Sequence, residues 1–206
     1  MIHELINYFI IGFLTSLSLI LAIGAQNIFV IEQGLKKKFV FLVCIICSIS
    51  DLILIFVGIF LFHFFNQFFT QSIELLLNIL LIIFLIYFIY SKIKIFNKPT
   101  DFELNLSNVS KSNIIFKTLG FTYLNPHVYS DTVFFLGNFS KGFLLSEKIT
   151  FGIGASIASF LFFFAIGYLS VFFSKYAKNQ SIWKIINFSV IVFMSILTFY
   201  IITEIF

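Results

Sequence analysis

Long apolar runs dominate the pattern of hydrophobic and polar positions along this chain. Six runs are long enough to cross a bilayer, which takes about 20 apolar residues. They cover Leu5–Ile31, Phe39–Phe62, Ile73–Ile95, Ile114–Phe139, Ile149–Phe173 and Ile182–Ile202. Helices are expected throughout, because a helix satisfies its own backbone polar groups within lipid. The pattern therefore predicts an all-α, polytopic membrane bundle of six transmembrane helices.

Composition agrees with a lipid bilayer as the surroundings of these runs. Hydrophobic residues occupy 60% of the 206 positions and charged residues only 11%, whereas a soluble domain usually carries about 25% charged residues. A globule of this size cannot hide so much apolar surface from water. The first run lacks the basic start of a signal peptide and is longer than a signal-peptide core, so we expect it to remain as a span. Residues 1–206 are thus predicted to form one transmembrane domain.

The lysines predict the orientation of the spans. Eleven of the 13 lysines lie in or beside the connections after the first, third and fifth runs, and only Lys141 and Lys148 flank the opposite side. Positive residues concentrate in cytoplasmic loops, so the odd-numbered loops are expected in the cytoplasm and both termini outside. Because the lysines lie in separate short loops, the net charge of +4 does not indicate nucleic-acid binding.

One hydrophilic stretch divides the chain into two parts. Residues 97–113, which include Asp101 and Glu103, are expected to form a cytoplasmic loop between halves at about 1–96 and 114–206. Each half has three predicted spans, so the two halves run in opposite directions across the membrane. Transporters often consist of such inverted repeats, with the binding site at their interface. We therefore expect two inverted three-helix halves, although no repeat is visible in the sequence itself.

Two carboxylates lie deep within the predicted spans. Asp51 lies 13 residues after Lys38, and Asp131 lies 14 residues after Lys117, which is about 20 Å along a helix for Asp51 and about 21 Å for Asp131 if its span is continuous. In a hydrocarbon core about 30 Å thick, both fall near mid-depth, where an aspartate costs roughly 2.5–3.5 kcal/mol. Such residues usually serve a function, here the binding of a cation or the carriage of a proton beside a wet cavity. Packing against a polar neighbour is the alternative.

Two polar segments interrupt apolar runs and supply further candidates. In the fourth run Pro126 removes a helical hydrogen bond, and in the first run Gly24 is expected to break the helix in a similar way. Broken helices at mid-membrane commonly bind polar substrates, and a kink without a ligand is the alternative. The candidate binding residues beside these two breaks are Gln26, Asn27, Asn125, His127 and Tyr129.

Cys44 and Cys47 form a C-x-x-C pair within the second run. A membrane thiol–disulfide carrier uses such a pair, but two small apolar residues on a buried helix give the same pattern. A carrier needs a second pair to receive its electrons, and the chain has no other cysteine, so we favour packing and keep the carrier as an alternative function. No nucleophile–base pair or metal-ligand cluster of recognisable spacing occurs. Neither an enzyme, a catalytic residue, a metal site nor a cofactor is expected.

Three segments together resemble the lysine/arginine exporter family (LysE type). They are the stretch Gly12–Leu35 with Gly24-Ala25-Gln26-Asn27 at its centre, Cys47–Asp51, and Leu124–Thr132. The matching segments occur in the same order as in the family, and the resemblance extends over nearly the whole chain. The sequence Asn-Pro-His-Val-Tyr followed by an aspartate is quite specific for the branch of this family that handles basic amino acids.

The resemblance implies multi-pass, secondary active export of L-lysine or L-arginine across the bacterial inner membrane, driven by the electrochemical gradient. Asp51 and Asp131 would neutralise the cationic groups of the substrate, while Gln26, Asn27 and Asn125 would hydrogen-bond its α-groups. Export of a cation from a negative interior costs about 2.3 kcal/mol per 100 mV, so we expect exchange for protons that compete for one carboxylate. Export of neutral amino acids or other small metabolites is the alternative. The sequence does not separate lysine from arginine and leaves open whether copies of the chain associate.

Overall fold

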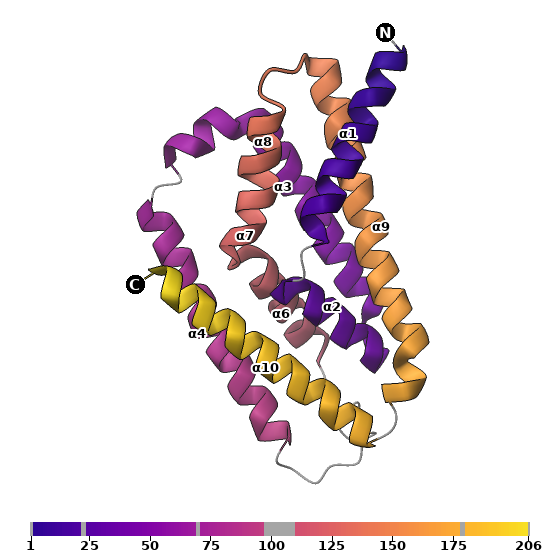
Figure 1. Cartoon of the computed structure of the whole chain (residues 1–206), viewed down its shortest axis with the longest axis vertical. Helices are drawn as coiled ribbons and strands as arrows, with labels where there is room; N and C mark the ends of the chain where they lie inside the picture. Colours follow the sequence, from indigo (N-terminus) through magenta and orange to yellow (C-terminus); the bar gives the residue numbers. More distant parts are fainter. Residues whose placement is uncertain (1, 22–23, 69–70, 97–109, 178–179, 206) are drawn as a thin grey trace.

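In the computed structural model the chain is a set of helices joined by short connections (Figure 1). The structure describes residues 2–21, 24–68, 71–96, 110–177 and 180–205. No strand occurs within these ranges. The all-α class predicted from the apolar runs is therefore confirmed.

The helices fall on either side of the predicted central loop. Before it lie α1 (Ile2–Ile20), α2 (Ala25–Lys36), α3 (Val40–Phe68) and α4 (Gln71–Phe96). After it lie α6 (Lys111–Tyr123), α7 (Pro126–Tyr129), the π-helix η1 (Ser130–Phe135), α8 (Leu136–Phe139), α9 (Leu145–Ala177) and α10 (Gln180–Ile205). Of the predicted loop 97–113, residues 97–109 lie outside the described part of the chain, and α6 begins at Lys111.

Two helices are by themselves long and apolar enough to cross a bilayer. They are Val40–Phe62 within α3 and Leu145–Lys175 within α9. Leu5–Ile20 and Ala25–Lys36 meet the same criteria only as a pair, and this pair bends by 82° at its break. Shorter apolar stretches lie in α4 and α10, at Asn78–Tyr90 and Phe188–Thr203. The described residues thus contain two to three candidate spans, and the count of six in two inverted halves stays a prediction.

The first predicted span is interrupted after Ile20. Gly24 stands at the N-cap of α2 in an extended backbone conformation, and no side chain caps this helix end. The Asn27 Nδ2 atom donates a hydrogen bond of 3.0 Å to the Ile20 carbonyl oxygen. This bond gives a partner to one of the carbonyl groups that the end of α1 leaves without a helical donor, so Asn27 holds α2 against α1.

The fourth predicted span is divided into several helical pieces. α6 ends at Tyr123, and Pro126 begins α7, a position where its missing N–H removes no helical hydrogen bond. The backbone N–H of His127 donates a hydrogen bond of 3.1 Å to Asn125 Oδ1. Asn125 therefore caps α7 at its first turn, and η1 and α8 continue the same course (Figure 1).

Two glycines allow the π-helix to lie directly against α3. A Cβ atom at Gly58 would lie 2.6 Å from the Val133 carbonyl oxygen, and one at Gly137 would lie 2.6 Å from that of Gly58. The backbones of η1 and α8 therefore approach α3 without an intervening side chain, as small residues permit between membrane helices. Asp51 lies seven residues before Gly58, which is two helical turns on nearly the same face of α3. The close contact thus brings η1 to the face of α3 that carries Asp51.

α9 is the long helix along which α1, α2 and α3 lie (Figure 1). Its contact with α1 runs through glycines on both helices, because Gly154 faces the backbone of Phe9 and Gly12 faces the backbone of Phe151. On the opposite side of the molecule α4 and α10 lie against each other. This arrangement leaves α2, α6, α7 and η1 between the α9 side and the α4–α10 pair.

Candidate functional site

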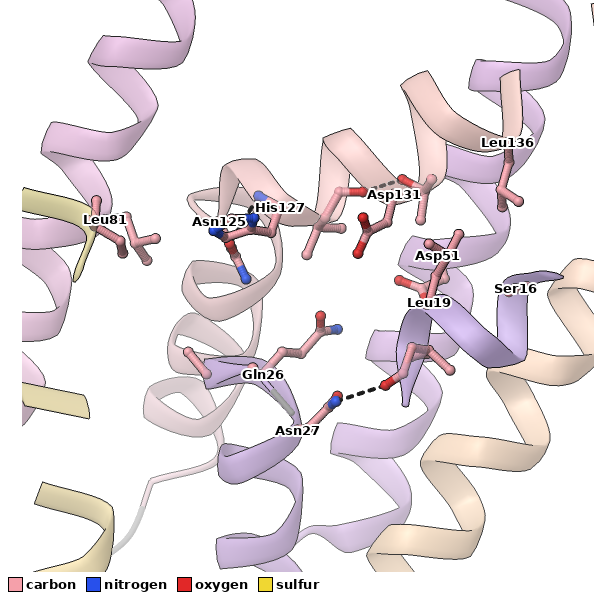
Figure 2. A pocket seen from close by; sticks show the side chains of 16 residues that line it. Ser16, Leu19, Gln26, Asn27, Asp51, Leu81, Asn125, His127, Asp131 and Leu136 are labelled. Atoms are coloured by element: carbon pink, nitrogen blue, oxygen red, sulfur yellow. Dashed lines mark hydrogen bonds between the residues drawn. The ribbon is translucent and has the colours of Figure 1, made fainter. Parts of the chain in front are cut away.

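A cavity of about 350 Å³ lies where the two helix breaks meet (Figure 2). Its volume falls within the range of roughly 300–1,000 Å³ that is usual for small-molecule sites. The polar residues of its lining are Ser16, Gln26, Asn27, Asp51, Asn125, His127, Asp131 and Thr132. The other lining residues are Leu19, Ile20, Gly24, Ala25, Leu81, Val128, Leu136 and Ile201. Nearly all of the predicted binding residues therefore border one cavity.

The two predicted carboxylates reach this cavity from different helices. Asp51 projects from α3 and is 5% exposed, and Asp131 projects from η1. Figure 2 shows both side chains directed towards the same space, and their charges interact. Two carboxylates that share one buried site repel each other unless a cation or a proton compensates their charge. The arrangement can therefore bind a cationic group.

Ser159 of α9 orients the first of these carboxylates. Its hydroxyl donates a hydrogen bond of 2.7 Å to Asp51 Oδ2, and the serine itself is fully buried. A hydrogen bond from a neutral donor to a charged acceptor contributes more than one between neutral groups. Ser159 was not among the residues predicted for the site. The only available signal was a serine within an apolar run, which packing explains equally well.

Gln26 brings a hydrogen-bond donor into the cavity. Its side chain is 6% exposed and extends towards the cavity in Figure 2. Its Nε2 atom makes no hydrogen bond of normal geometry to the residues that the structure describes, although the Cys47 thiol of α3 lies near the Gln26 side chain. A buried donor without a partner costs about 1–3 kcal/mol, so a ligand that accepts a hydrogen bond here would recover that free energy. A carboxylate is a strong acceptor of this kind.

The start of α2 adds a second feature that favours an anionic group. The helix begins at Ala25, and both Gly24 and Ala25 line the cavity. The first N–H groups of a helix have no partner within the helix, and they carry the positive end of the helix dipole. No side chain caps them here. The cavity thus has carboxylates on one wall and the uncapped start of a helix on another.

The two asparagines line the cavity but also hold the breaks together. Asn27 bonds to the end of α1 and Asn125 caps α7, as described above. His127 lines the cavity as well, and its ring interacts electrostatically with Asp131. These residues shape the site whether or not they touch a ligand, and their contact with substrate stays a prediction.

Tyr129 differs from the other candidates because it is not part of the cavity lining. Its hydroxyl donates a hydrogen bond of 2.9 Å to the Tyr123 carbonyl oxygen, at the end of α6. The bond spans the break around Pro126 and ties α7 to α6. In this structure Tyr129 supports the geometry of the break, and its predicted contact with substrate would require a different side-chain position.

The apolar part of the lining comes partly from helices that contain no predicted site residue. Leu81 of α4 and Ile201 of α10 both reach the cavity, and each is at most 2% exposed. Leu19 and Leu136 add apolar surface from α1 and α8. A site of this composition can bind a ligand that has charged groups at both ends of an aliphatic chain.

The cysteine pair is not part of the cavity lining. Cys44 and Cys47 are free and fully buried in α3, and neither lines the cavity. The Cys44 thiol donates a hydrogen bond of 3.2 Å to the Phe163 carbonyl oxygen of α9. These contacts are those of packing residues. Within the described ranges no group of three or more His, Cys, Asp or Glu side chains could hold a metal ion.

Comparisons with known proteins give one consistent result. The family model described as LysE type translocator matches residues 17–204. The chain is 32% identical to the arginine exporter protein ArgO of Salmonella paratyphi A over 198 residues, which cover 95% of this chain and 93% of that protein. The arginine exporter proteins of Salmonella enteritidis and Salmonella typhimurium match with the same identity and coverage. No solved structure matches this chain. These similarities indicate a transporter and not an enzyme.

Proposed function

Because this chain belongs to the LysE type translocator family, we propose that it exports basic L-amino acids, either L-arginine, L-lysine or both, across the bacterial inner membrane. The observation that carries this proposal is the pair of carboxylates, the buried Asp51 and the partly exposed Asp131, that line one cavity. The similarity to proteins named arginine exporters points to the same substrate class.

Charge balance favours a cationic substrate over a neutral amino acid. The lining contains two carboxylates, and no lysine occurs among its described residues. A neutral amino acid brings one ammonium and one carboxylate, so it leaves both negative charges of the site uncompensated. Arginine and lysine bring one more positive charge. Since an uncompensated buried charge is costly, the basic amino acids fit the site better.

The geometry supports a defined orientation of the bound amino acid. Its α-carboxylate would lie at the start of α2, where Gln26 Nε2 and the first backbone N–H groups can donate to it. Its side-chain cation would lie near Asp131 and Asp51, and its methylene groups would lie against Leu81 and Ile201. Each part of the substrate thus meets a surface of matching chemistry.

We place the cavity in the middle of a six-span bundle of two inverted halves, with α1–α2 as the first span and α6–α8 as the fourth. The end of α2, the start of α6 and the end of α9 gather at one end of the molecule (Figure 1), and Lys36, Lys111 and Lys175 lie there. We call it the lysine-rich end. The positive-inside rule assigns it to the cytoplasm, which leaves both termini outside.

Exchange for protons supplies the driving force in this proposal. Export of a cation against the membrane potential costs about 2.3 kcal/mol per 100 mV. A proton that neutralises Asp51 or Asp131 removes the charge that attracts the substrate, so proton and substrate compete for one site. Binding a proton on the outside would release the amino acid there. The loss of that proton in the cytoplasm would restore the site.

Counterflow in liposomes tests the proposal. Purified protein is reconstituted into liposomes that contain unlabelled arginine, and labelled arginine, lysine or citrulline is added outside. We expect accumulation of labelled arginine or lysine but not of citrulline, which has the length of arginine and an uncharged side chain. Asp51→Asn and Asp131→Asn should each reduce accumulation at least tenfold. Glu147→Gln should not, because Glu147 bonds to the Leu144 N–H at the exposed start of α9. Equal accumulation of citrulline, or full activity of both asparagine variants, would refute the proposal.

A further inference from the structure

Three buried phenylalanines lie together beside the cavity. They are Phe29 of α2, Phe88 of α4 and Phe121 of α6, and each is at most 2% exposed. The ring centroid of Phe121 lies 5.0 Å from those of both Phe29 and Phe88. The centroids of Phe29 and Phe88 are 6.4 Å apart. The three rings therefore form one continuous aromatic layer across three helices.

This aromatic layer lies between the cavity lining and the lysine-rich end. On α2, Phe29 follows the lining residue Gln26 by three positions. On α4, Phe88 follows Leu81 by seven, and on α6, Phe121 precedes Asn125 by four. Each spacing is close to one or two helical turns, so ring and lining residue share a helix face. In all three helices the ring lies on the side that leads to the lysine-rich end.

A charged group covers the far side of the aromatic layer. The Lys117 ammonium of α6 lies 5.6 Å from the centre of the Phe88 ring. Glu32, one turn beyond Phe29 on α2, is 2% exposed, and its charge acts on Lys117. Lys36 forms an ion pair with the same glutamate one turn further along α2. The Lys117 ammonium thus lies over an aromatic face of α4 and within the electrostatic influence of a buried carboxylate of α2, which itself pairs with Lys36.

We propose that Glu32 and Phe88 form an entrance site for the side-chain cation of the substrate, and that Lys117 occupies this site while the path to the cavity is closed. The inference rests on the proposed export of basic amino acids. A guanidinium or ammonium group can replace the Lys117 ammonium, because an aromatic face and a carboxylate attract any cation. Release of Lys117 frees α6 from Glu32 of α2 and allows the three rings to separate.

This arrangement links substrate binding to opening. A ligand shifts an equilibrium only by its difference in affinity for the two states. In the closed state the entrance site already holds a cation of the chain itself, so a basic amino acid gains its contacts there only when Lys117 has left. A neutral amino acid has no side-chain cation with which to compete. The entrance site would therefore select for charge before the substrate reaches Asp51 and Asp131.

Uptake of arginine into inside-out membrane vesicles tests the entrance site, because the cytoplasmic side then faces the medium. Lys117→Gln removes the competing cation and should lower the half-saturating arginine concentration roughly three- to fivefold. Glu32→Gln and Phe88→Leu should raise it by a similar factor. The matched control is Lys175→Gln, since the Lys175 ammonium lies 5.3 Å above the exposed ring of Phe172 on α9. This control should leave the half-saturating concentration unchanged.

Two further variants separate a role of charge from a loss of folding. Lys117→Arg keeps the cation and should not lower the half-saturating concentration. The double variant Glu32→Gln with Lys117→Gln removes both charges of the proposed contact, and it should behave like Glu32→Gln alone. The proposal is wrong if the wild-type chain exchanges arginine while Lys117→Gln and Glu32→Gln both keep the wild-type concentration dependence. If the wild-type chain itself fails to exchange basic amino acids, the proposed function is wrong, and the proposal of an entrance site is then wrong as well.

Discussion

The Ser159 hydroxyl of α9 donates a hydrogen bond of 2.7 Å to the Asp51 carboxylate of α3, and the two residues are 108 positions apart in the chain. Both side chains are buried, with Ser159 fully enclosed and Asp51 5% exposed. The bond connects the two helices that are long and apolar enough to cross a bilayer by themselves. It therefore orients a carboxylate of the cavity on the most regular part of the fold.

Ser159→Ala should weaken substrate binding without unfolding the protein. The change removes the only hydroxyl donor that the described residues give to Asp51 and leaves a methyl group of similar size. A hydrogen bond to a charged group contributes about 1.5–3 kcal/mol, so we expect the half-saturating arginine concentration in counterflow to rise about tenfold.

The matched control for this variant is Ser156→Ala. Ser156 is also buried in α9, but its hydroxyl donates to the Gly152 carbonyl oxygen of its own helix, at 2.8 Å. It should keep the arginine dependence of the wild-type chain. An equal effect of both alanine variants would show that α9 matters through packing and not through its bond to Asp51.

Much of the fold could be predicted from the sequence because the bilayer imposes simple rules. Apolar runs, a proline within the fourth run and a glycine-containing polar segment within the first are local features with local consequences. The structure interrupts both helices at these segments, around Gly24 and Pro126. Asp51 and Asp131 were predicted as site residues because they lie far from the ends of apolar runs, and both line the cavity, whereas their depth in the membrane stays a prediction. Charged and polar residues within a span are informative because their free-energy cost in lipid makes them rare.

The remaining features depend on contacts between distant segments, which one sequence does not reveal. The bond from Ser159 to Asp51 is one example, and the approach of Gly58 to the backbone of Val133 is another. Glu32 was missed because it lies just beyond the first apolar run, where a charged residue needs no explanation. The packing of α2 against α9, α3 and α6 leaves it buried. Likewise, no local signal predicted that Ser130–Phe135 would form a π-helix.

Replacing Gln26 should change the stability of the protein and its transport activity in opposite directions. Gln26→Leu removes the buried Nε2 donor that lacks a partner among the described residues, so the melting temperature should rise while accumulation of arginine falls at least tenfold. Gln33→Leu is the matched control. Gln33 is 2% exposed, its Oε1 atom also lacks a partner among the described residues, and it does not line the cavity. We expect a similar gain in stability with unchanged transport. Normal transport by Gln26→Leu would exclude this side chain as a ligand of the substrate.

The position of Asp131 should depend on the glycine contact between α3 and η1. In Gly58→Ala the new Cβ would lie 2.6 Å from the Val133 carbonyl oxygen and 2.7 Å from that of Thr132. Both atoms belong to backbone, so the clash cannot be relieved by a rotation of a side chain. Overpacking of this kind costs about 1–3 kcal/mol. We expect a lower melting temperature and a displacement of η1 that moves Asp131 away from Asp51.

Transport kinetics can distinguish that displacement from a general loss of stability. Gly142→Ala is the control, because a Cβ at Gly142 meets nothing within 4 Å in the described structure. Gly58→Ala should raise the half-saturating arginine concentration even at temperatures well below its melting point, whereas Gly142→Ala should change neither property. A Gly58→Ala variant that is less stable but binds arginine normally would show that the two carboxylates act without the close approach of η1 to α3. Asp131 would then have to reach the substrate independently of Asp51.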